Sequence, residues 1–268
     1  GAIAIVSLPH ARWSSLVSPA PRQKAKAAFD AGAAAVVLVT HGPTGEALAL
    51  NAPADGPMFP RPAAVLAPRA AAPFLAAAAR GQAGRLTVTG SGGRREAYNI
   101  VARLDRRRGR WLVVSTPRSG WFGCAGERGP GVAIWLMLAR WAARADLPVD
   151  IAFVCNSGHE YENLGAARLL HDAAPKPEQT AFWLHLGANA AARDWHDLGG
   201  QMAPLPSADP QRYLGVSSSL IEEARRIFAG QPGLEAPYPA APGAAGELGH
   251  IIAAGYPALA GVFGAGEI

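Results

Sequence analysis

The sequence predicts an α/β protein in which a mixed, mostly parallel central sheet is flanked by helices and accompanied by a smaller α/β domain. Short apolar segments of strand type alternate with helical segments, the order typical of parallel sheets that are covered on both faces. The 31 Gly and 23 Pro supply turns for many short elements. Half of the 268 residues are hydrophobic, which is enough for one large core or two modest ones.

Residues 1–95 are predicted to form the smaller domain. Its expected strands are 2–8, 34–40, 63–66 and 85–89, and its expected helices are 22–31 and 70–80. The segment 34–40 is typical of a buried strand because it is rich in β-branched residues and bounded by Gly and Pro. Both helices are expected to end at a glycine, Gly32 or Gly81.

Residues 96–268 are predicted to form the larger α/β domain. The expected strands are 98–104, 111–116, 151–155, 181–186 and 258–263, and the expected helices are 131–145, 164–173, 220–228 and 248–254. We expect the first two of these strands to form an antiparallel hairpin. The loops after Thr116, Asn156 and Leu186, and the loop before the last strand, should converge, because sites in such sheets lie where parallel strands end.

The formal net charge of +5 raises the question of a nucleic-acid partner. Only three of the 25 basic residues are lysine, so we attribute the charge to arginine-rich coding. One dense basic cluster, residues 106–110, falls between two expected strands and is interpreted as a solvated hairpin tip. The sequence therefore predicts no nucleic-acid partner.

The cysteine content and the hydropathy restrict the class of protein further. Cys124 and Cys155 are the only cysteines; they form no disulfide framework and no CxxC pair, which favours a reducing compartment such as the cytoplasm. No apolar run reaches the roughly 18 residues that a membrane-spanning helix needs. The chain begins without Met inside a strand pattern, so we expect the native start to lie upstream. The oligomeric state stays open.

Residues that can carry chemistry gather in the converging loops. The loop after residue 116 holds Ser119, Trp121, Cys124, Glu127 and Arg128. The loop after residue 156 holds His159 and Glu160. His185 comes near the end of the next strand, and Glu247 and His250 precede the last strand. Glu, His and Ser at strand ends are typical of hydrolytic sites. The glycines around 126–131 lack the Gly-Lys-Ser/Thr of a phosphate loop, so no nucleotide cofactor is expected.

These segments resemble the co-catalytic zinc exopeptidases, which include bacterial aminopeptidases and glutamate carboxypeptidases and often carry a protease-associated domain. Residues 111–116 match the first strand of the family, 125–133 its bridging segment, 151–165 the strand with its Glu pair, and 255–259 a late Gly-x-Pro-Ala element. Residues 31–36, ahead of a hydrophobic strand, resemble the protease-associated domain. The resemblance implies a peptide or amide-type small ligand.

The family's metal ligands are mostly replaced in this sequence. Pro117 stands at the position of the family's first His, and Ser119 at that of the following Asp. Glu127 replaces the bridging Asp, His159 the catalytic Glu and His185 the later Asp. Glu160 keeps the family's residue type. The family's last His does not occur before Ile268. Because each zinc ion needs three or more N or O ligands, the dizinc mechanism is not carried over to this chain.

Three functional interpretations remain open. In the first, a pseudopeptidase keeps the fold and uses the cleft for binding. In the second, a rebuilt mononuclear zinc site uses Glu127, Glu160 and His185, with His159 as a further ligand. In the third, Cys124 or Ser119 is a nucleophile for metal-free hydrolysis, with His159 as base and a glutamate as orienter. Zinc is thus either mononuclear or absent. The candidate catalytic residues are His159, Glu160 and Glu127; the candidate ligand contacts are Arg128, Ser119 and Trp121; the candidate metal ligands are Glu160, His185 and Glu127.

Purely structural roles compete with these assignments. Glu127 and Arg128 can form an ion pair at a helix N-terminus, where a carboxylate suits the helix dipole. His185 can be a hydrogen-bonded core histidine, and Trp121 can pack in a core or lid. Cys155, inside an apolar strand, is interpreted as a small core residue.

Overall fold

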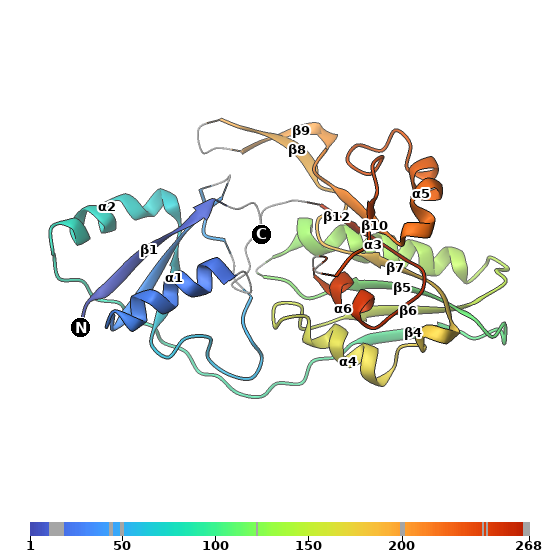
Figure 1. Ribbon diagram of the computed structural model, residues 1–268, viewed down its shortest axis with the longest axis horizontal. Helices are drawn as coiled ribbons and strands as arrows, with labels where there is room; N and C mark the ends of the chain where they lie inside the picture. The colour runs from blue at the N-terminus through green and yellow to red at the C-terminus, as the bar shows by residue number, and fades with distance from the viewer. Residues whose placement is uncertain are drawn as a thin grey trace. The chain divides into compact units, whose positions relative to one another are not determined.

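The computed structural model describes residues 1–10, 19–42, 45–48, 51–121, 123–198, 202–242, 244 and 246–264. The described residues form two compact units (Figure 1), the first built from residues 1–96 together with the segment 195–203, and the second from residues 97–194 and 204–264. The segment 195–203 is an addition that the contiguous division expected from the sequence does not contain. Among the described helices, none combines the length and the apolar composition required to cross a bilayer.

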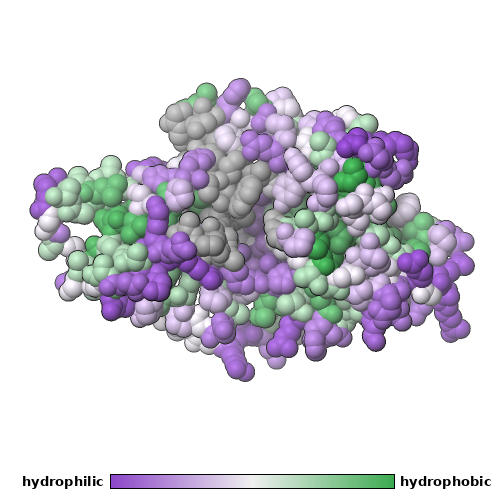
Figure 2. Space-filling view, in the orientation of Figure 1, coloured by the Kyte–Doolittle hydropathy of each residue, from purple (hydrophilic) through white to green (hydrophobic). Residues whose placement is uncertain are grey.

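The first unit is a small parallel sheet with two helices. Its strands β1 (Ile3–His10), β2 (Ala35–His41) and β3 (Ala63–Leu66) lie in the order β1-β2-β3, and its helices are α1 (Pro19–Asp30) and α2 (Pro68–Ala79). Phe29 of α1 belongs to the same buried cluster as Val36 and Leu38 of β2. Phe74 and Leu75 of α2 are exposed, and Figure 2 shows hydrophobic surface over this helix.

One strand expected in the first unit is absent. Residues 82–99 form no helix or strand, so the strand predicted over 85–89 is wrong. Val88 of this segment is 56% exposed. The alternating pattern predicted a strand, but an extended segment becomes a strand only where a neighbouring strand pairs with its backbone groups.

The second unit is built on a seven-stranded mixed sheet. Its strands are β4 (Ile100–Leu104), β5 (Trp111–Pro117), β6 (Asp150–Asn156), β7 (Thr180–Leu186), β10 (Tyr213–Val216), β11 (Tyr238–Pro239) and β12 (Leu259–Phe263), in the order β11-β10-β12-β7-β5-β6-β4. Strands β12, β7, β5 and β6 are parallel to one another, whereas β4 and β10 run antiparallel to β6 and β12. This arrangement confirms the predicted fold class.

The hairpin predicted between β4 and β5 is wrong, because β6 lies between them and pairs with both. The connecting loop is held by Asp150 at the start of β6, whose carboxylate accepts hydrogen bonds from the backbone N–H groups of Arg106, Arg108 and Gly109. The Arg106 guanidinium donates to the carbonyl oxygens of Ala142 and Ala145, at the carboxyl end of helix α3 (Ala125–Ala142). The arginine-rich segment therefore has a structural role in this loop.

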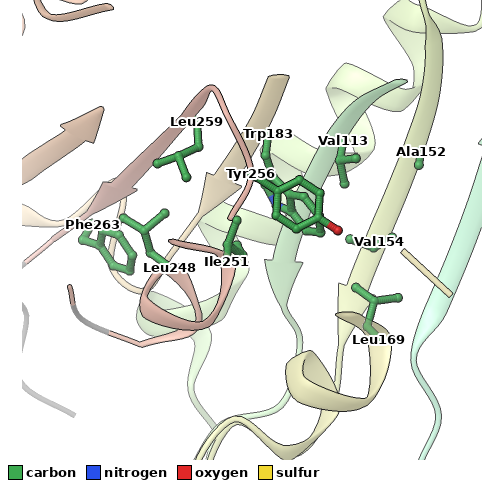
Figure 3. Close-up of a cluster of buried hydrophobic side chains, with 10 residues drawn as sticks. All are labelled: Val113, Ala152, Val154, Leu169, Trp183, Leu248, Ile251, Tyr256, Leu259 and Phe263. Atoms are coloured by element: carbon green, nitrogen blue, oxygen red, sulfur yellow. The ribbon is translucent and has the colours of Figure 1, made fainter. Parts of the chain in front are cut away.

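Helices cover both faces of this sheet. Val113 and Val114 of β5 point to opposite faces because side chains alternate along a strand. Val114 belongs to a buried cluster with Trp135 of α3. Val113 belongs to another, drawn in Figure 3, with Leu169 of α4 (Leu164–Asp172) and Leu248 of α6 (Glu247–Ala253). A further helix, α5 (Ile221–Ile227), packs on β10 and β12 through Ala224.

Two aromatic residues anchor the cluster of Figure 3. The ring centroids of Trp183 and Tyr256 lie 4.4 Å apart in an edge-to-face arrangement. Both polar ends are satisfied, since the Tyr256 hydroxyl donates to the carbonyl oxygen of Pro175 at 2.7 Å and the Trp183 indole N–H donates to Ser115 Oγ at 2.7 Å.

Helix α3 begins earlier than predicted, at Ala125 instead of residue 131. Pro130 lies inside this helix, at its sixth position, where a proline removes one backbone hydrogen bond of the helix. Glu127 and Arg128 therefore lie on the helix itself. Gly131 permits close contact with the sheet, since a Cβ there would come within 2.6 Å of Thr116 Oγ1.

Several short elements were not predicted from the sequence. They are β8 (Arg193–Asp197) and β9 (Met202–Ala208), which pair only with each other, the strands β10 and β11, and the 3₁₀ turns Pro177–Gln179 and Ser218–Leu220. The strands β9, β10 and β11 contain proline or glycine, which weakens their strand pattern, and β8 is a polar segment of five residues.

Candidate functional site

Five charged or titratable side chains meet where the sheet's loops converge. Glu127 and Arg128 come from the first turns of α3, His159 and Glu160 from the turn after β6, and Glu247 from the first position of α6. An Arg128 nitrogen lies 3.6 Å from a Glu160 oxygen, and His159 Nδ1 lies 3.7 Å from Glu247 Oε1. We call these five residues the charged cluster.

Arg128 links the two carboxylates on the α3 side of the charged cluster. Its side chain is 4% exposed, and its Nη2 lies 2.5 Å from Glu127 Oε1. Its Nε donates to the backbone carbonyl of Ser119 at 2.5 Å, which fixes the guanidinium plane. The ion pair foreseen as a structural alternative for Glu127 and Arg128 is therefore present, and it also reaches Glu160.

Glu247 is the member that the sequence analysis noted in a converging loop but gave no role. It is fully buried, and its Oε2 accepts a hydrogen bond of 2.9 Å from the Asn156 amide. Its Oε1 and the facing His159 Nδ1 have no hydrogen-bond partner in the described part of the chain. The available signal was its place in the loop before the last strand, one of the four loops expected to converge.

His185 lies inside the sheet, on β7, and not in a loop. The Trp183 indole, which can only donate, gives its proton to Ser115 Oγ, and this hydroxyl lies 2.9 Å from His185 Nδ1. A hydroxyl can donate one hydrogen bond and accept two, so Ser115 either donates to Nδ1 or accepts from it, depending on the imidazole tautomer. Burial lowers the pKa of His185 to about 4, although Glu247 acts in the opposite direction. His185 is thus a neutral, hydrogen-bonded core histidine near neutral pH.

The two most buried carboxylates of the charged cluster have pKa values shifted in opposite directions. Burial raises the pKa of Glu127, and the attraction of Arg128 and His159 offsets this only in part. Burial also acts to raise the pKa of Glu247, but His159, His185 and Asn156 outweigh it and hold that pKa below the usual glutamate value. Carboxyl groups with separated pKa values in one site are typical of functional sites as well as of structural ion-pair networks.

The remaining candidate residues differ in how they meet the charged cluster. Ser119 Oγ accepts a hydrogen bond of 3.1 Å from the backbone N–H of His159. This hydrogen bond involves the His159 backbone and not its imidazole ring. The backbone of Gly120 packs closely against Cys124 and Glu127. A Cβ at this position would lie 2.7 Å from the Cys124 side chain and 3.1 Å from Glu127 Oε2. Burial raises the pKa of the Cys155 thiol to about 11, in keeping with a core residue. Trp121 stands at a bend after β5, and its predicted ligand contact stays a prediction.

Strained backbone concentrates around this site. Among the described residues, five other than glycine have a positive φ. Three of these belong to the segments of the charged cluster, namely Cys124, Glu162 and Asn163, and a fourth, Asn189, lies in the loop after β7. The Asn189 N–H donates to the carbonyl of Glu127 at 3.0 Å. Such conformations cost about 1–3 kcal/mol each and gather at functional sites.

Comparison with solved structures identifies the fold. A peptidase M28 precursor from Shewanella amazonensis aligns with 99% of this chain at a TM-score of 0.65 and 14% identity. The fold is zinc-exopeptidase-like. An aminopeptidase from Aneurinibacillus aligns with 99% of the chain at a TM-score of 0.57 and 15% identity, and a zinc aminopeptidase from Bacillus subtilis with 97% at 0.54 and 16%.

The chain spans only part of these zinc-exopeptidase-like structures, namely 60%, 61% and 59% of their respective chains. At such identities the similarity establishes the fold alone. No protein-family model matches the sequence, and no curated protein matches it either.

The side chains present do not fit a dinuclear zinc centre. Across the described residues, no three His, Cys, Asp or Glu side chains are arranged to hold one metal ion. Glu127 and Glu160 face the Arg128 guanidinium, and His185 Nδ1 is hydrogen-bonded to Ser115. The two carboxylates expected to bind zinc thus lie against a cation of the chain itself, and one nitrogen of His185 is already hydrogen-bonded.

Proposed function

We propose that this chain is a divergent member of the zinc aminopeptidase and carboxypeptidase-like family whose metal site is degraded and whose charged cluster binds a peptide or amide-type ligand. The observation that carries the proposal is Arg128, a buried permanent cation 2.5 Å from Glu127 and 3.6 Å from Glu160. A guanidinium keeps its charge at any pH that a protein tolerates, so these two carboxylates have a counterion within the chain.

The chemistry of the charged cluster suits an amide. Arg128 Nη1 is a donor and Glu160 Oε1 an acceptor, and both are buried without a hydrogen-bond partner among the described residues. An amide group offers both a carbonyl acceptor and an N–H donor, so it would pair with both once a local opening of the site exposes them. His159 and Glu160, with side chains 16% and 12% exposed, are the accessible edge of the site.

A rebuilt mononuclear zinc site is the second candidate. The observation in its favour is that Glu127 Oε2, Glu160 Oε1 and His159 Nδ1 are all buried without a hydrogen-bond partner in the described structure. Carboxylate oxygens and imidazole nitrogens are ordinary zinc ligands. This candidate requires the Arg128 side chain to move away from the two carboxylates.

The deciding experiment measures metal content and ligand binding together. Protein purified without chelator is analysed for zinc, tested with aminoacyl-p-nitroanilides and carboxypeptidase substrates, and titrated calorimetrically with short peptide amides. We expect substoichiometric zinc, no turnover, and peptide-amide binding that weakens at least ~10-fold in Glu160→Gln. The exposed Glu235→Gln is the matched control and should bind as the wild type does.

Other results would lead to different conclusions. One zinc ion per chain that is lost in Glu160→Ala or His185→Ala would support the rebuilt site. Two zinc ions per chain with chelator-sensitive turnover would refute the proposal. Turnover that resists chelators but is lost after thiol alkylation and in His159→Ala would support the metal-free nucleophile. Absence of peptide-amide binding would refute the proposed ligand class.

A further inference from the structure

We propose that the peptide bond between Arg94 and Arg95 is a specific cleavage site for an arginine-directed endopeptidase, and that the cut leaves the larger unit folded. This site lies outside the charged cluster and adds a modification to the proposed ligand binding. Cleavage is a hydrolysis that breaks the C–N bond of this peptide. The oxygen of a water molecule joins the Arg94 carbonyl carbon and a proton passes to the Arg95 nitrogen, so the products are a carboxylate and an amine.

The segment around this bond is open to solvent. Residues 82–99 form neither helix nor strand, and Figure 1 shows them as a trace between α2 and β4. From residue 81 to residue 98 every residue is exposed except the partly buried Leu86. A Cβ added at Gly90 or Gly92 would meet no described atom within 4 Å, so no described side chain packs against the backbone there. Proteolytic cuts fall preferentially in exposed segments of small and polar residues.

The backbone of the segment is also free to enter a protease. From residue 83 to residue 95, no backbone group is hydrogen-bonded to another backbone group within the described part of the chain. The Arg94 carbonyl accepts a hydrogen bond of 3.0 Å from the neighbouring Arg95 guanidinium, and both residues are exposed. Such a surface contact contributes little because water replaces it. Since proteins bind extended peptides through the backbone N–H and C=O groups of the peptide, this segment can be bound as it stands.

Arg94 and Arg95 are the best-placed arginines of the segment. An arginine-directed protease holds the guanidinium against a carboxylate in its specificity pocket, so the side chain must be able to leave the surface. Arg85 is the other arginine of this segment, and it is followed by the partly buried Leu86. Packing thus holds the chain on one side of Arg85. Residues 90–93, ahead of Arg94, are Gly or Ser and are all exposed, and such a composition gives a flexible chain.

A second Arg-Arg sequence in the chain provides a contrast. Arg107 and Arg108, in the loop between β4 and β5, are exposed as well. The N–H groups of Arg108 and Gly109 donate to the Asp150 carboxylate at 3.0 and 2.9 Å, and Arg107 has a φ of 60°. An extended strand has a negative φ, so a protease would first have to break these hydrogen bonds and turn the backbone. The structure therefore favours cleavage at Arg94 over cleavage in this loop.

The cut leaves the larger unit in one fragment. All seven strands of the mixed sheet follow Arg95 in the chain, since β4 begins at Ile100, and so do the five members of the charged cluster. The three buried hydrophobic clusters of this unit likewise contain only residues beyond 95. We therefore expect the fragment 95–268 to stay folded and to keep the ligand binding proposed for the charged cluster.

The test is limited digestion of the intact chain with trypsin, followed over time by mass spectrometry of the fragments. We expect the first products to be residues 1–94 and 95–268, and the larger product to resist further cleavage while it stays folded. The variant Arg94→Gln/Arg95→Gln should prolong the lifetime of the intact chain at least ~5-fold. Arg107→Gln/Arg108→Gln also removes two adjacent exposed arginines. It is the matched control and should be cut at the wild-type rate.

A first cut at another basic residue, or an equal lifetime of the wild type and Arg94→Gln/Arg95→Gln, would overturn the cleavage site. Degradation of the fragment 95–268 as fast as it forms would overturn the expected stability of the larger unit. Calorimetry with short peptide amides keeps this proposal apart from the proposed function. An uncut protein that binds no peptide amide refutes the proposed function alone, whereas binding that is present before the cut and lost after it shows that the cut damages the larger unit.

Discussion

The buried histidine of β7 should make the stability of the protein depend on pH. Burial lowers the pKa of His185 from 6.5 to about 4. A histidine with a lowered pKa in the folded state stabilises the fold fully above its unfolded pKa, and this stabilisation is lost as the pH falls toward the folded value. One unit of pKa shift corresponds to about 1.4 kcal/mol, so His185 contributes about 3 kcal/mol in total.

The perturbation that isolates this contribution is His185→Asn, because the Asn amide can either accept from or donate to the Ser115 hydroxyl and does not titrate. Between pH 7 and pH 5 the wild type should lose about 2 kcal/mol more unfolding free energy than His185→Asn does. The assay is urea unfolding at several pH values. His171→Asn, an exposed histidine on α4, is the control and should keep the wild-type pH dependence.

Equal pH dependence in the wild type and in His185→Asn would refute the reasoning. Nuclear magnetic resonance of the wild-type imidazole gives a second measurement that needs no variant. A titration midpoint near the ordinary histidine value would contradict the effect of burial on His185.

Two further predictions concern the core and the cysteines. Leu248→Ala, at a position 1% exposed, should lower the unfolding free energy by about 2–5 kcal/mol. Leu136→Ala, at a position 52% exposed on α3, should change it by less than about 0.5 kcal/mol; urea unfolding checks both, and similar losses would contradict the layer assignment. Because the Cys155 thiol is buried with its pKa raised to about 11, iodoacetamide at pH 8 should label the partly exposed Cys124 first. Mass spectrometry of the native and urea-unfolded protein measures this order, and prompt labelling of native Cys155 would be inconsistent with its burial.

The parallel strands could be predicted because their burial is present in the sequence itself. All seven residues of β6, for example, are buried, and a run of apolar and β-branched residues is what a strand covered on both faces requires. The helices α4 and α6 were likewise found within one or two residues of their actual ends.

The strand partners could not be predicted in the same way. β4 and β5 are neighbours in the sequence, yet β6 lies between them. The loop between β4 and β5 is held by Asp150 at the start of β6. The Asp150 carboxylate accepts hydrogen bonds from this loop, about forty residues away in the chain. Local sequence patterns do not encode such a long-range contact. The prediction therefore paired β4 with β5, its neighbour in the sequence, and this pairing was wrong.

The sequence by itself determined the α/β class and indicated that Glu127, Arg128, His159 and Glu160 follow strands whose ends meet, although Glu127 and Arg128 lie on α3 and not in a loop. Only the tertiary structure decided how their charges are paired. It set Arg128 against Glu127 and Glu160, turned His185 into the core, and brought in Glu247, whose partner Asn156 is 91 residues away. The physical reason is that ion pairing depends on distances of a few ångströms between elements, and these distances follow from the strand order and the helix starts, not from residue type.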